Sequence, residues 1–460
     1  MKKFFHLPLK SSVEGIIWPP MSNPRAAAHL AMQYQLEHTQ RLTTEEIQQH
    51  QLQQLNLLWH YACRQVPYYR QRLPLLPFSE REPLTWDHWQ RIPLLTRDNI
   101  QMEQDSLLSR NVPPKHGKPF KTQTSGSTAK PLTVWHSSLT TFFWRAFTLR
   151  EHFWHQRDFS GKLAAIRFIN NKNARAPHGL QLGGWGTSTD IVLKTGPACF
   201  LDIKTPLEEQ ASWLDREQPQ FLLSYPTNIL ALAHHFKNSG KALSNLQEVR
   251  TFGETVTDET RTLCQEVWGV ELTDMYSTRE VGYIALQCPE ERQYHVQAEN
   301  VLVEILRDDG TSCSPGEVGK VVITPLHNFA SPLIRYDIGD YAVLGEPCPC
   351  GRGLPVINKI MGRVRNMLTL PTGQRFWPSF NYKGLTKVVA YRQIQICQHT
   401  ASELEIRLVV DGQISTDQEK EMTAIIHKAL NYPFAIAFTY ADTIPRTKGG
   451  KYEEFISHVA

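Results

Sequence analysis

The stretch Thr124-Ser-Gly-Ser-Thr-Ala-Lys-Pro131 combines three kinds of group that bind phosphate. Gly126 lets backbone N–H groups approach an anion closely, and Lys130 adds a compact positive charge. The hydroxyls come from Thr124, Ser125, Ser127 and Thr128. The spacing is not that of the Walker loop, in which a lysine and a hydroxyl follow the second glycine directly. The stretch predicts a polyphosphate-binding loop, and the alternative is a polar surface loop.

The bulk properties indicate a globular protein of more than one domain. At 460 residues the chain is longer than a typical domain with a single hydrophobic core. Its contents of 41% apolar and 20% charged residues are ordinary for globular proteins. A formal charge of +4 is too small over this length to indicate a nucleic acid or an anionic membrane as partner. No apolar run is long enough to span a membrane, and the opening residues lack the apolar core of a signal peptide. The eight cysteines form no dense framework, so we expect a cytoplasmic protein.

Strand and helix patterns alternate in the middle of the chain. Residues 29–72 are typical of helix, and Thr43 with Glu46 three residues later predicts a capping box. Between about 130 and 340, we expect strands at 162–169, 221–224, 249–252 and 319–324, and helices at 206–217 and 257–268. Thr205 is the predicted N-cap of the first of these helices, with Glu208 completing a capping box. This alternation predicts an α/β architecture with a largely parallel sheet.

The pattern of expected strands and helices changes near residue 362. A strand at 403–410, a turn at Asp411-Gly412, a helix at 416–430 and a strand at 434–440 describe a small α+β domain. We therefore expect three regions. They are an N-terminal helical extension at 1–54, a large domain at 55–362 and a small C-terminal domain at 363–460. The role of the extension stays open between a contact with a partner or a second copy and a solvated segment.

Four further stretches carry candidate functional groups. They are Phe252-Gly-Glu-Thr255, Tyr276-Ser-Thr-Arg-Glu280, Arg335-Tyr-Asp-Ile-Gly-Asp340 and Pro445-Arg-Thr-Lys-Gly-Gly-Lys451. A glycine permits close approach to a flat ligand, an aromatic ring can stack on a base, and carboxylates bind Mg²⁺ or ribose hydroxyls. Each stretch taken singly also fits an ordinary turn, strand end or basic loop.

Three cysteines and a histidine have the composition of a zinc site. Cys288 and His295 are spaced as Cys-x₆-His, and Cys348-Pro-Cys350 supplies a tight pair. Three thiolates and one imidazole suit tetrahedral Zn²⁺ in a closed structural site. The alternative is that these cysteines pack as small apolar residues, which is what we expect of the other five. Those five are Cys63, Cys199, Cys264, Cys313 and Cys397.

In this order and at these separations, the stretches resemble the acyl-adenylate-forming (AMP-dependent synthetase and ligase) superfamily. The match is closer to its phenylacetate–CoA ligase branch, with that branch's capsule-biosynthesis-like relatives. The resemblance covers about residues 55–455 and implies a large N-terminal α/β adenylate-forming domain with mixed sheets and helices, plus a small mobile C-terminal α+β domain. It rests on Ser125–Thr128, Gly253–Thr255, Tyr276 with Glu280-Val281-Gly282, Arg335–Asp340, Cys348–Arg352, Gly362-Arg363, Gly450-Lys451 and an entry segment at 61–73. Some members of the branch carry a similar Cys/His set.

The resemblance implies a two-step reaction and a role for each stretch. A carboxylic acid and ATP form acyl-AMP and pyrophosphate, and the acyl group then passes to a thiol of coenzyme A or of an acyl carrier protein. The implied phosphate ligands are Thr124, Ser125, Gly126, Ser127, Thr128 and Lys130. Gly253, Glu254, Thr255 and Tyr276 are expected to line the adenine, with Asp340 on the ribose. The implied catalytic residues are Lys451, Glu280 as the Mg²⁺ ligand, and Arg363.

Some residues depart from the superfamily's pattern. Ala129 and Ser277 stand where glycine is frequent, and Arg279 stands where Thr or Ser precedes the glutamate. The expected hinge near Arg365 lacks the usual acidic residue. Arg279 places a cation beside the expected Mg²⁺ ligand, where it can meet a phosphate or a substrate carboxylate or can signal altered activity.

The substrate is expected to be a small aryl or arylacetic acid, by analogy with the nearest branch. Tyr225 and Phe252 are candidate pocket residues, and Trp185 is a candidate at the entrance. Two alternatives stay open. One is an adenylating enzyme that transfers the acyl group to an amine or sugar in polysaccharide or natural-product assembly. The other is a catalytically degenerate relative that acts as a binding protein, and a homodimer is a further possibility.

Overall fold

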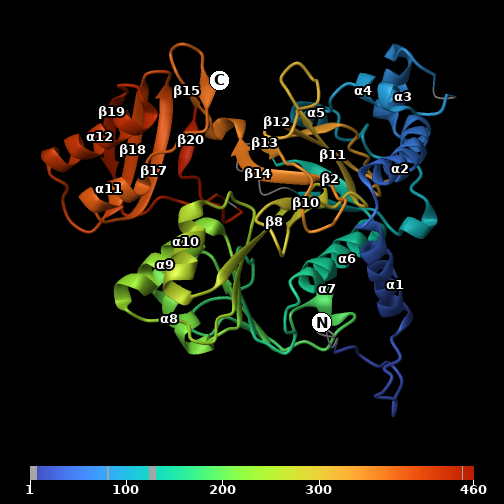
Figure 1. Ribbon diagram of the computed structural model, residues 1–460, viewed down its shortest axis with the longest axis horizontal. Coiled ribbons are helices and arrows are strands. Elements are labelled where there is room, and N and C mark those ends of the chain that lie inside the picture. The colour runs from blue at the N-terminus through green and yellow to red at the C-terminus, as the bar shows by residue number, and fades with distance from the viewer. Residues whose placement is uncertain (1–7, 80–81, 124–130, 448, 460) are drawn as a thin grey trace. The chain divides into compact units, whose positions relative to one another are not determined.

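The computed structural model describes residues 8–79, 82–123, 131–447 and 449–459. The chain divides into two compact units, Met1–Ile360 and Met361–Ala460. The sequence places the corresponding boundary at 362/363. Each unit has a sheet and a hydrophobic core of its own (Figure 1).

The first unit is built on a 12-stranded sheet in the order β11-β12-β13-β14-β10-β9-β8-β7-β6-β3-β5-β4. Five neighbouring strands run parallel: β5 (Ala198–Asp202), β3 (Leu163–Arg167), β6 (Phe221–Ser224), β7 (Glu248–Phe252) and β8 (Glu271–Thr278). The other strands are β4 (Leu180–Leu182), β9 (Gly282–Gln287), β10 (Tyr294–Val296), β11 (Val301–Leu306), β12 (Val318–Pro325), β13 (Tyr336–Leu344) and β14 (Val356–Arg363). Most residues of the parallel strands are buried, as expected of strands joined by crossover connections, but β7 and β8 also bury the charged residues Glu248, Arg250 and Asp274.

The helices of the first unit cover this sheet (Figure 1). α8 (Leu207–Glu217), α9 (Pro226–Ser239) and α10 (Asp258–Trp268) pack on the parallel strands through Trp213, Phe236 and neighbouring aliphatic side chains. The remaining helices and turns are α1 (Pro24–Thr39), α2 (Thr44–Gln65), α3 (Pro67–Arg72), η1 (Leu73–Leu75), α4 (Trp86–Arg91), α5 (Arg97–Met102), η2 (Pro114–His116), α6 (Ser138–Trp154) and α7 (Thr187–Asp190). A separate hairpin joins β1 (Phe120–Gln123) to β2 (Thr133–His136).

Of the two predicted capping boxes, one is present in the structure and the other is not. The capping box of Thr43 and Glu46 is confirmed, since each side chain bonds the other residue's backbone N–H. The capping box predicted at Thr205 is wrong, because α8 begins one residue later with Pro206 as its N-cap and has no side-chain cap. Gln210 instead donates to the Thr205 carbonyl at 2.7 Å, which satisfies that backbone group from within the helix.

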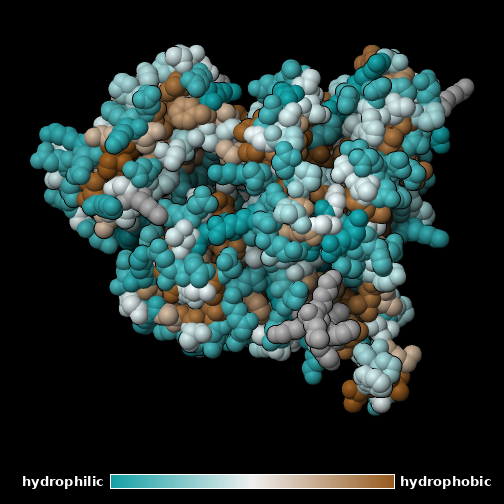
Figure 2. All heavy atoms as spheres, in the orientation of Figure 1, coloured by the Kyte–Doolittle hydropathy of each residue, from teal (hydrophilic) through white to brown (hydrophobic). Residues whose placement is uncertain are grey.

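The N-terminal helices are part of the first unit. Leu36 and Ile47, from α1 and α2, share a buried cluster with Phe147 and Trp154 of α6. The segment before α1 leaves Ile17 and Trp18 each 88% exposed. Figure 2 shows that the rest of the face in view is mostly hydrophilic, with hydrophobic side chains in small groups.

The second unit is a small α+β domain. A four-stranded sheet has the order β19-β18-β17-β20, with β17 (Tyr391–Thr400), β18 (Glu403–Val410), β19 (Ala435–Tyr440) and β20 (Phe455–Ser457). The other elements are η3 (Val364–Asn366), β15 (Leu368–Thr369), β16 (Arg375–Phe376), α11 (Tyr382–Val388) and α12 (Thr416–Leu430). Met422 and Ile426 of α12 pack on the buried face of the sheet. No described helix in either unit is long and apolar enough to cross a membrane.

Candidate functional site

Most of the candidate residues of the first unit lie at one edge of its sheet. Because β3, β6, β7 and β8 are parallel, their carboxyl ends meet at that edge, where ligands bind in open α/β sheets. Gly253, Glu254 and Thr255 follow β7 directly, and Tyr276 lies near the end of β8. Gly253 has a φ of 80°, which favours glycine at the turn out of the strand. The predicted stretches therefore converge on one edge.

A hydrogen bond joins two of these stretches. The Tyr276 hydroxyl donates to Asp340 Oδ2 at 2.7 Å. Asp340 lies on β13, where the register against β12 shifts between Lys320 and Val322. Gly339, with a φ of 80°, donates its backbone N–H to Asp337 within this irregular segment. A bulge of this kind re-aims side chains at a site, and here it accompanies an aspartate held by a tyrosine.

Glu254 is fixed by the start of a helix. Its Oε2 accepts hydrogen bonds from the backbone N–H and the hydroxyl of Thr227, at 3.1 and 2.7 Å. Thr227 is in the first turn of α9, where unsatisfied N–H groups favour a carboxylate. This contact holds the turn after β7 against the neighbouring crossover.

Glu280 is a buried carboxylate in the turn after β8. It is 6% exposed, and no described residue forms a hydrogen bond or ion pair with its side chain. The adjacent Arg279 donates to the Gln123 carbonyl at 3.1 Å, and its own carbonyl lies 3.0 Å from His136 Nε2. The hairpin of β1 and β2 is thereby attached beside Glu280. A carboxylate with no described partner offers the oxygen ligands that Mg²⁺ prefers, so the donor chemistry at Glu280 fits a cation.

The predicted phosphate loop lies outside the described residues. It comprises Thr124, Ser125, Gly126, Ser127, Thr128, Ala129 and Lys130. Gln123, which precedes it, is described and contacts Arg279 as above. The roles of these residues stay predictions.

Arg363 and Lys451 belong to the second unit. Lys451 closes a tight loop, because its backbone N–H donates to Thr447 Oγ1 and its carbonyl accepts from the Thr447 N–H, at 3.1 and 2.8 Å. Arg365, near the expected hinge, forms an ion pair with Glu453, two residues after Lys451. The hinge segment and the lysine loop are thus joined within this unit.

Of the three predicted pocket residues, two lie together. The rings of Tyr225 and Phe252 are 4.8 Å apart at the carboxyl edge of the sheet. Trp185 is 6% exposed and packs on Phe221, at the opposite ends of the parallel strands, while its Nε1 donates to the Gly161 carbonyl. The structure therefore does not bring Trp185 to the other two.

The four predicted zinc ligands converge in the first unit. The ligand atoms of Cys288, His295, Cys348 and Cys350 all lie within 4.8 Å of one another. The sulfurs of Cys288 and Cys348 are 3.9 Å apart, and Cys350 Sγ is 3.3 Å from His295 Nε2. A tetrahedral ion with bonds of about 2.3 Å separates two sulfurs by about 3.8 Å, so this cluster fits zinc. The other five cysteines are buried, as expected.

Arg352 lies against this cluster. Its Nη1 is 3.9 Å from Cys288 Sγ and 3.3 Å from Glu290, and its guanidinium stacks on Trp154 at 4.7 Å. Burial raises the pKa of the Cys350 thiol, but the Arg352 backbone N–H and guanidinium outweigh burial and lower that pKa. Burial and the same guanidinium lower the pKa of His295 to about 4, which keeps its imidazole neutral. Neutral imidazole and thiolate are the forms that bind a metal.

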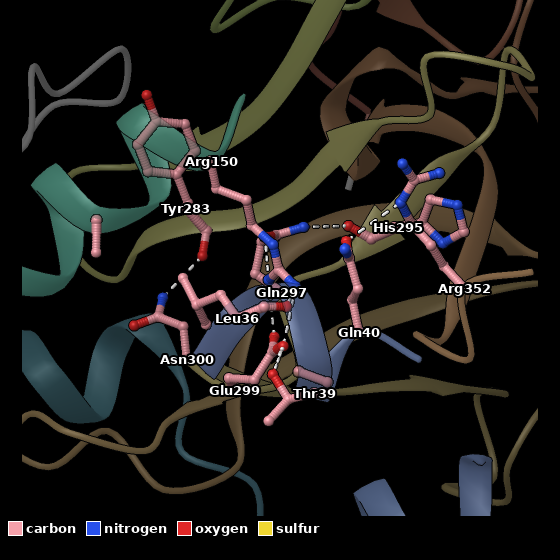
Figure 3. Close-up of polar contacts among 12 residues, drawn as sticks. Leu36, Thr39, Gln40, Arg150, Tyr283, His295, Gln297, Glu299, Asn300 and Arg352 are labelled. Carbon is pink, nitrogen blue, oxygen red and sulfur yellow. Dashed lines mark hydrogen bonds and ion pairs between the residues drawn. The ribbon is translucent and has the colours of Figure 1, made fainter. Parts of the chain in front are cut away.

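The corner between α1 and α2 supports the cluster (Figure 3). Gln40 Oε1 accepts from Trp154 Nε1 at 2.9 Å and from Arg352 Nε at 3.3 Å. A Cβ on Gly353 would lie 1.8 Å from the Leu42 carbonyl, so only glycine allows this close approach.

A buried ion pair extends the same support (Figure 3). Arg150 donates to both oxygens of Glu299, at 2.9 and 3.0 Å, and to the Leu36 carbonyl at 3.0 Å. Thr39 donates to Glu299 at 2.7 Å. This ion pair thus joins the end of α1 to α6 and to the segment after β10.

Comparison with known proteins agrees with this geometry. The CapK C-terminal domain family matches residues 379–458. A phenylacetate–coenzyme A ligase of Thermus thermophilus is 30% identical over 214 residues, which are 44% of this chain and 48%, about half, of that protein. A phenylacetate–coenzyme A ligase of Pseudomonas putida is 24% identical over 347 residues, 73% of this chain and 74% of the relative. The chain is similar in sequence to phenylacetate–coenzyme A ligases and to the protein CapK of Staphylococcus aureus, which is 20% identical over 437 residues, 89% of each chain.

Its fold is that of the acyl-adenylate-forming ligases. The crystal structure of 2-hydroxyisobutyryl-CoA ligase in the postadenylation state superposes with a TM-score of 0.70, at 17% identity and over 90% of each chain. Two contacts of the site were not expected from the sequence: the hydrogen bond from Tyr276 to Asp340 and the contact of Arg352 with Cys288. No local sequence pattern predicts either contact, because each joins residues that are more than 60 positions apart.

Proposed function

We propose that this protein activates a carboxylic acid with ATP as an acyl-adenylate and transfers the acyl group to a thiol. The observation that carries the proposal is the hydrogen bond from Tyr276 to Asp340, at the edge where Gly253–Thr255 and Glu280 also lie. The resemblance assigns these stretches to nucleotide binding. Their proximity supports that assignment, because stretches with unrelated roles would not be expected to lie together. The homology to phenylacetate–coenzyme A ligases supports the same reaction.

In the first step, a carboxylate oxygen of the acid attacks the α-phosphorus of ATP. The bond from that phosphorus to the bridging oxygen breaks, and pyrophosphate leaves. The protein's task is to position two anions and to neutralise charge as it develops. Asp340, oriented by the Tyr276 hydroxyl, accepts from the ribose hydroxyls, while Lys451 and Arg363 stabilise the phosphate and carboxylate charge.

In the second step, a thiolate attacks the carbonyl carbon of the acyl-adenylate and AMP leaves. Coenzyme A is the proposed acceptor because the homologues are named for it. A carrier-protein thiol is the alternative, and the two are separated by measuring which acceptor stimulates AMP release. We place the reaction in the cytoplasm, where cysteines such as the eight of this chain persist without forming disulfides.

Two metals complete the proposal. Glu280 would hold Mg²⁺, which neutralises phosphate charge when bound, and the absence of a described partner for this buried carboxylate fits that role. Cys288, His295, Cys348 and Cys350 would hold a structural Zn²⁺. The zinc would join the segment after β9 to the loop between β13 and β14.

The test is exchange of labelled pyrophosphate into ATP, measured with a panel of small carboxylic acids. Acid-dependent exchange is the expected result. Nucleotide binding without exchange for any acid would contradict the proposal and favour a degenerate binding protein. An Asp340→Asn variant is the matched control, and it should lose exchange because the amide keeps the shape but not the charge at the ribose.

A further inference from the structure

The two strands of the β1–β2 hairpin are attached to the first unit in different ways. β2 is secured by burial, because Val134 lies in a hydrophobic core and Asn328 donates to the Trp135 carbonyl at 2.9 Å. β1 has no buried residue. The hairpin is also a sheet of its own, so the 12-stranded sheet gives β1 no hydrogen bonds. The strand that leads into the predicted phosphate loop is therefore the less secured of the two.

Arg279 supplies the attachment that β1 otherwise lacks. Among the described residues, it is the only one outside the hairpin that forms a hydrogen bond with β1, at 3.1 Å from the Gln123 carbonyl. Its own carbonyl can only accept, and His136 Nε2 of β2 donates to it at 3.0 Å. Arg279 thus bonds to β1 through its side chain and to β2 through its backbone.

These two bonds lie toward opposite ends of the hairpin. His136 pairs with Phe120 at the end remote from the predicted phosphate loop, and Gln123 pairs with Thr133 at the end next to it. The Arg279 side chain therefore extends along the hairpin toward that loop. A threonine or serine, which the resemblance implies at this position, carries its hydroxyl on Cβ and lacks such a stem. The attachment of β1 is therefore specific to the arginine.

The bond from Arg279 to Gln123 connects two parts of the proposed nucleotide site. Gln123 directly precedes Thr124, the first predicted phosphate ligand, and Arg279 directly precedes Glu280, the proposed Mg²⁺ ligand. A bound Mg²⁺ and the phosphates that it neutralises have to lie within bonding distance of each other. The position of the end of β1 relative to Glu280 therefore matters for the triphosphate, because stabilisation of charge depends on preorganised geometry.

We propose that Arg279 is a positioning residue that holds the end of β1 beside Glu280 and thereby supports binding of the β- and γ-phosphates of ATP. This inference rests on the function proposed above and gives a role to a residue that departs from the superfamily's pattern. In it the guanidinium contacts β1 and not the nucleotide. The bond is single and exposed, so its loss should weaken ATP binding by roughly 3- to 10-fold and not abolish it.

Hydrogen exchange in the nucleotide-free protein tests the attachment itself. Arg279→Met keeps an unbranched stem but removes the donors, so the amides of β1 should exchange faster while those of β7 stay unchanged. Arg279→Lys should restore part of the protection, since an ammonium group can still donate to the Gln123 carbonyl. Lys118→Met is the matched control, because it removes an exposed positive charge just before β1 that has no described hydrogen bond or ion pair. It should leave the exchange of β1 as in the natural protein.

Nucleotide affinity tests the consequence, with Mg²⁺ and ATP compared with AMP in the same variants. Arg279→Met should weaken binding of ATP by roughly 3- to 10-fold and leave that of AMP unchanged, because AMP lacks the β- and γ-phosphates. Lys118→Met should change neither affinity.

Several results would overturn the inference. Weaker ATP binding without faster exchange in β1 would mean that the guanidinium contacts the phosphates directly. Equal losses for ATP and AMP, equal effects in Lys118→Met, or faster exchange throughout the first unit would each contradict a local positioning role. By contrast, the expected changes in exchange and affinity, together with no acid-dependent pyrophosphate exchange by the natural protein, would support the role of Arg279 and overturn only the proposed reaction.

Discussion

Replacing Arg352 by methionine tests whether its charge supports the proposed zinc site. Three thiolates, one neutral imidazole and Zn²⁺ carry a net charge of −1, and the Arg352 guanidinium lies 3.9 Å from one of the sulfurs. Methionine keeps much of the apolar stem that packs on Trp154 but removes the cation. We expect zinc to stay bound in one equivalent but more weakly.

The size of the effect follows from the surroundings of Arg352. Opposite unit charges about 4 Å apart attract by about 1 kcal/mol in water and about 4 kcal/mol at an effective dielectric constant near 20. The Arg352 side chain is 8% exposed, which excludes the water limit. Glu290, 59% exposed, already pairs with Arg352 and takes up part of the charge. We therefore expect Arg352→Met to weaken zinc binding by about 1.4–2.7 kcal/mol, or about 10- to 100-fold in affinity. A loss of this size is usual when a residue that supports metal ligands is changed.

The assay is competition for zinc against a chromophoric chelator. Arg41→Met is the matched control, since Arg41 donates to the Cys350 carbonyl at 3.3 Å from an exposed position. It should change the affinity by less than about 3-fold, as expected of a solvent-screened charge. Equal affinities for the Arg352 variant and the natural protein would refute the reasoning, and so would an equal loss in both variants.

Three further predictions follow from other parts of the structure. Cys348→Ser should release the zinc, and one equivalent of zinc still bound in that variant would reject the metal site. Lys451→Ala should slow pyrophosphate exchange by roughly 10²–10³-fold, the effect of losing one charge-stabilising donor, and an unchanged rate would remove Lys451 from the first step. Burial opposes ionisation of Glu248, but Arg157 outweighs it and lowers the pKa to about 2. The resulting stabilisation, about 3 kcal/mol, is present above pH about 4.5 and is lost as pH falls toward 2, so Glu248→Gln should flatten the acid side of a denaturation profile. A profile unchanged by that substitution would contradict the assignment.

Local sequence signals were sufficient for several elements. The strand at 403–410 and the helix at 416–430 have the predicted bounds, because alternation and helical periodicity are properties of the segment itself. The capping box at Thr43 is equally local. By contrast, no local pattern indicates β20, a strand of three residues that forms by pairing in parallel with β17. The false cap at Thr205 shows that a matching residue pattern does not ensure a capping box, since α8 begins without a side-chain cap.

The candidate site was predictable where residue type alone carries the chemistry. The four predicted zinc ligands do converge, and they could be recognised in the sequence because thiolates and imidazole together have the composition of a metal site. Arg352 and Gln40 were not predictable, because their contacts depend on how α1 packs against the loop before β14. Trp185 was expected at a pocket entrance because glycines surround it in the sequence. In the structure Gly186 instead forms a turn in which its backbone N–H donates to Asp190. Trp185 itself packs in the hydrophobic core.

The most direct test of adenylate formation follows an oxygen atom. An acid that supports exchange is labelled with ¹⁸O in its carboxylate and incubated with the protein, ATP and the thiol acceptor. If the carboxylate attacks the α-phosphorus, one labelled oxygen per turnover appears in AMP and none in pyrophosphate. Unlabelled AMP, or the formation of ADP and phosphate in its place, would contradict the account.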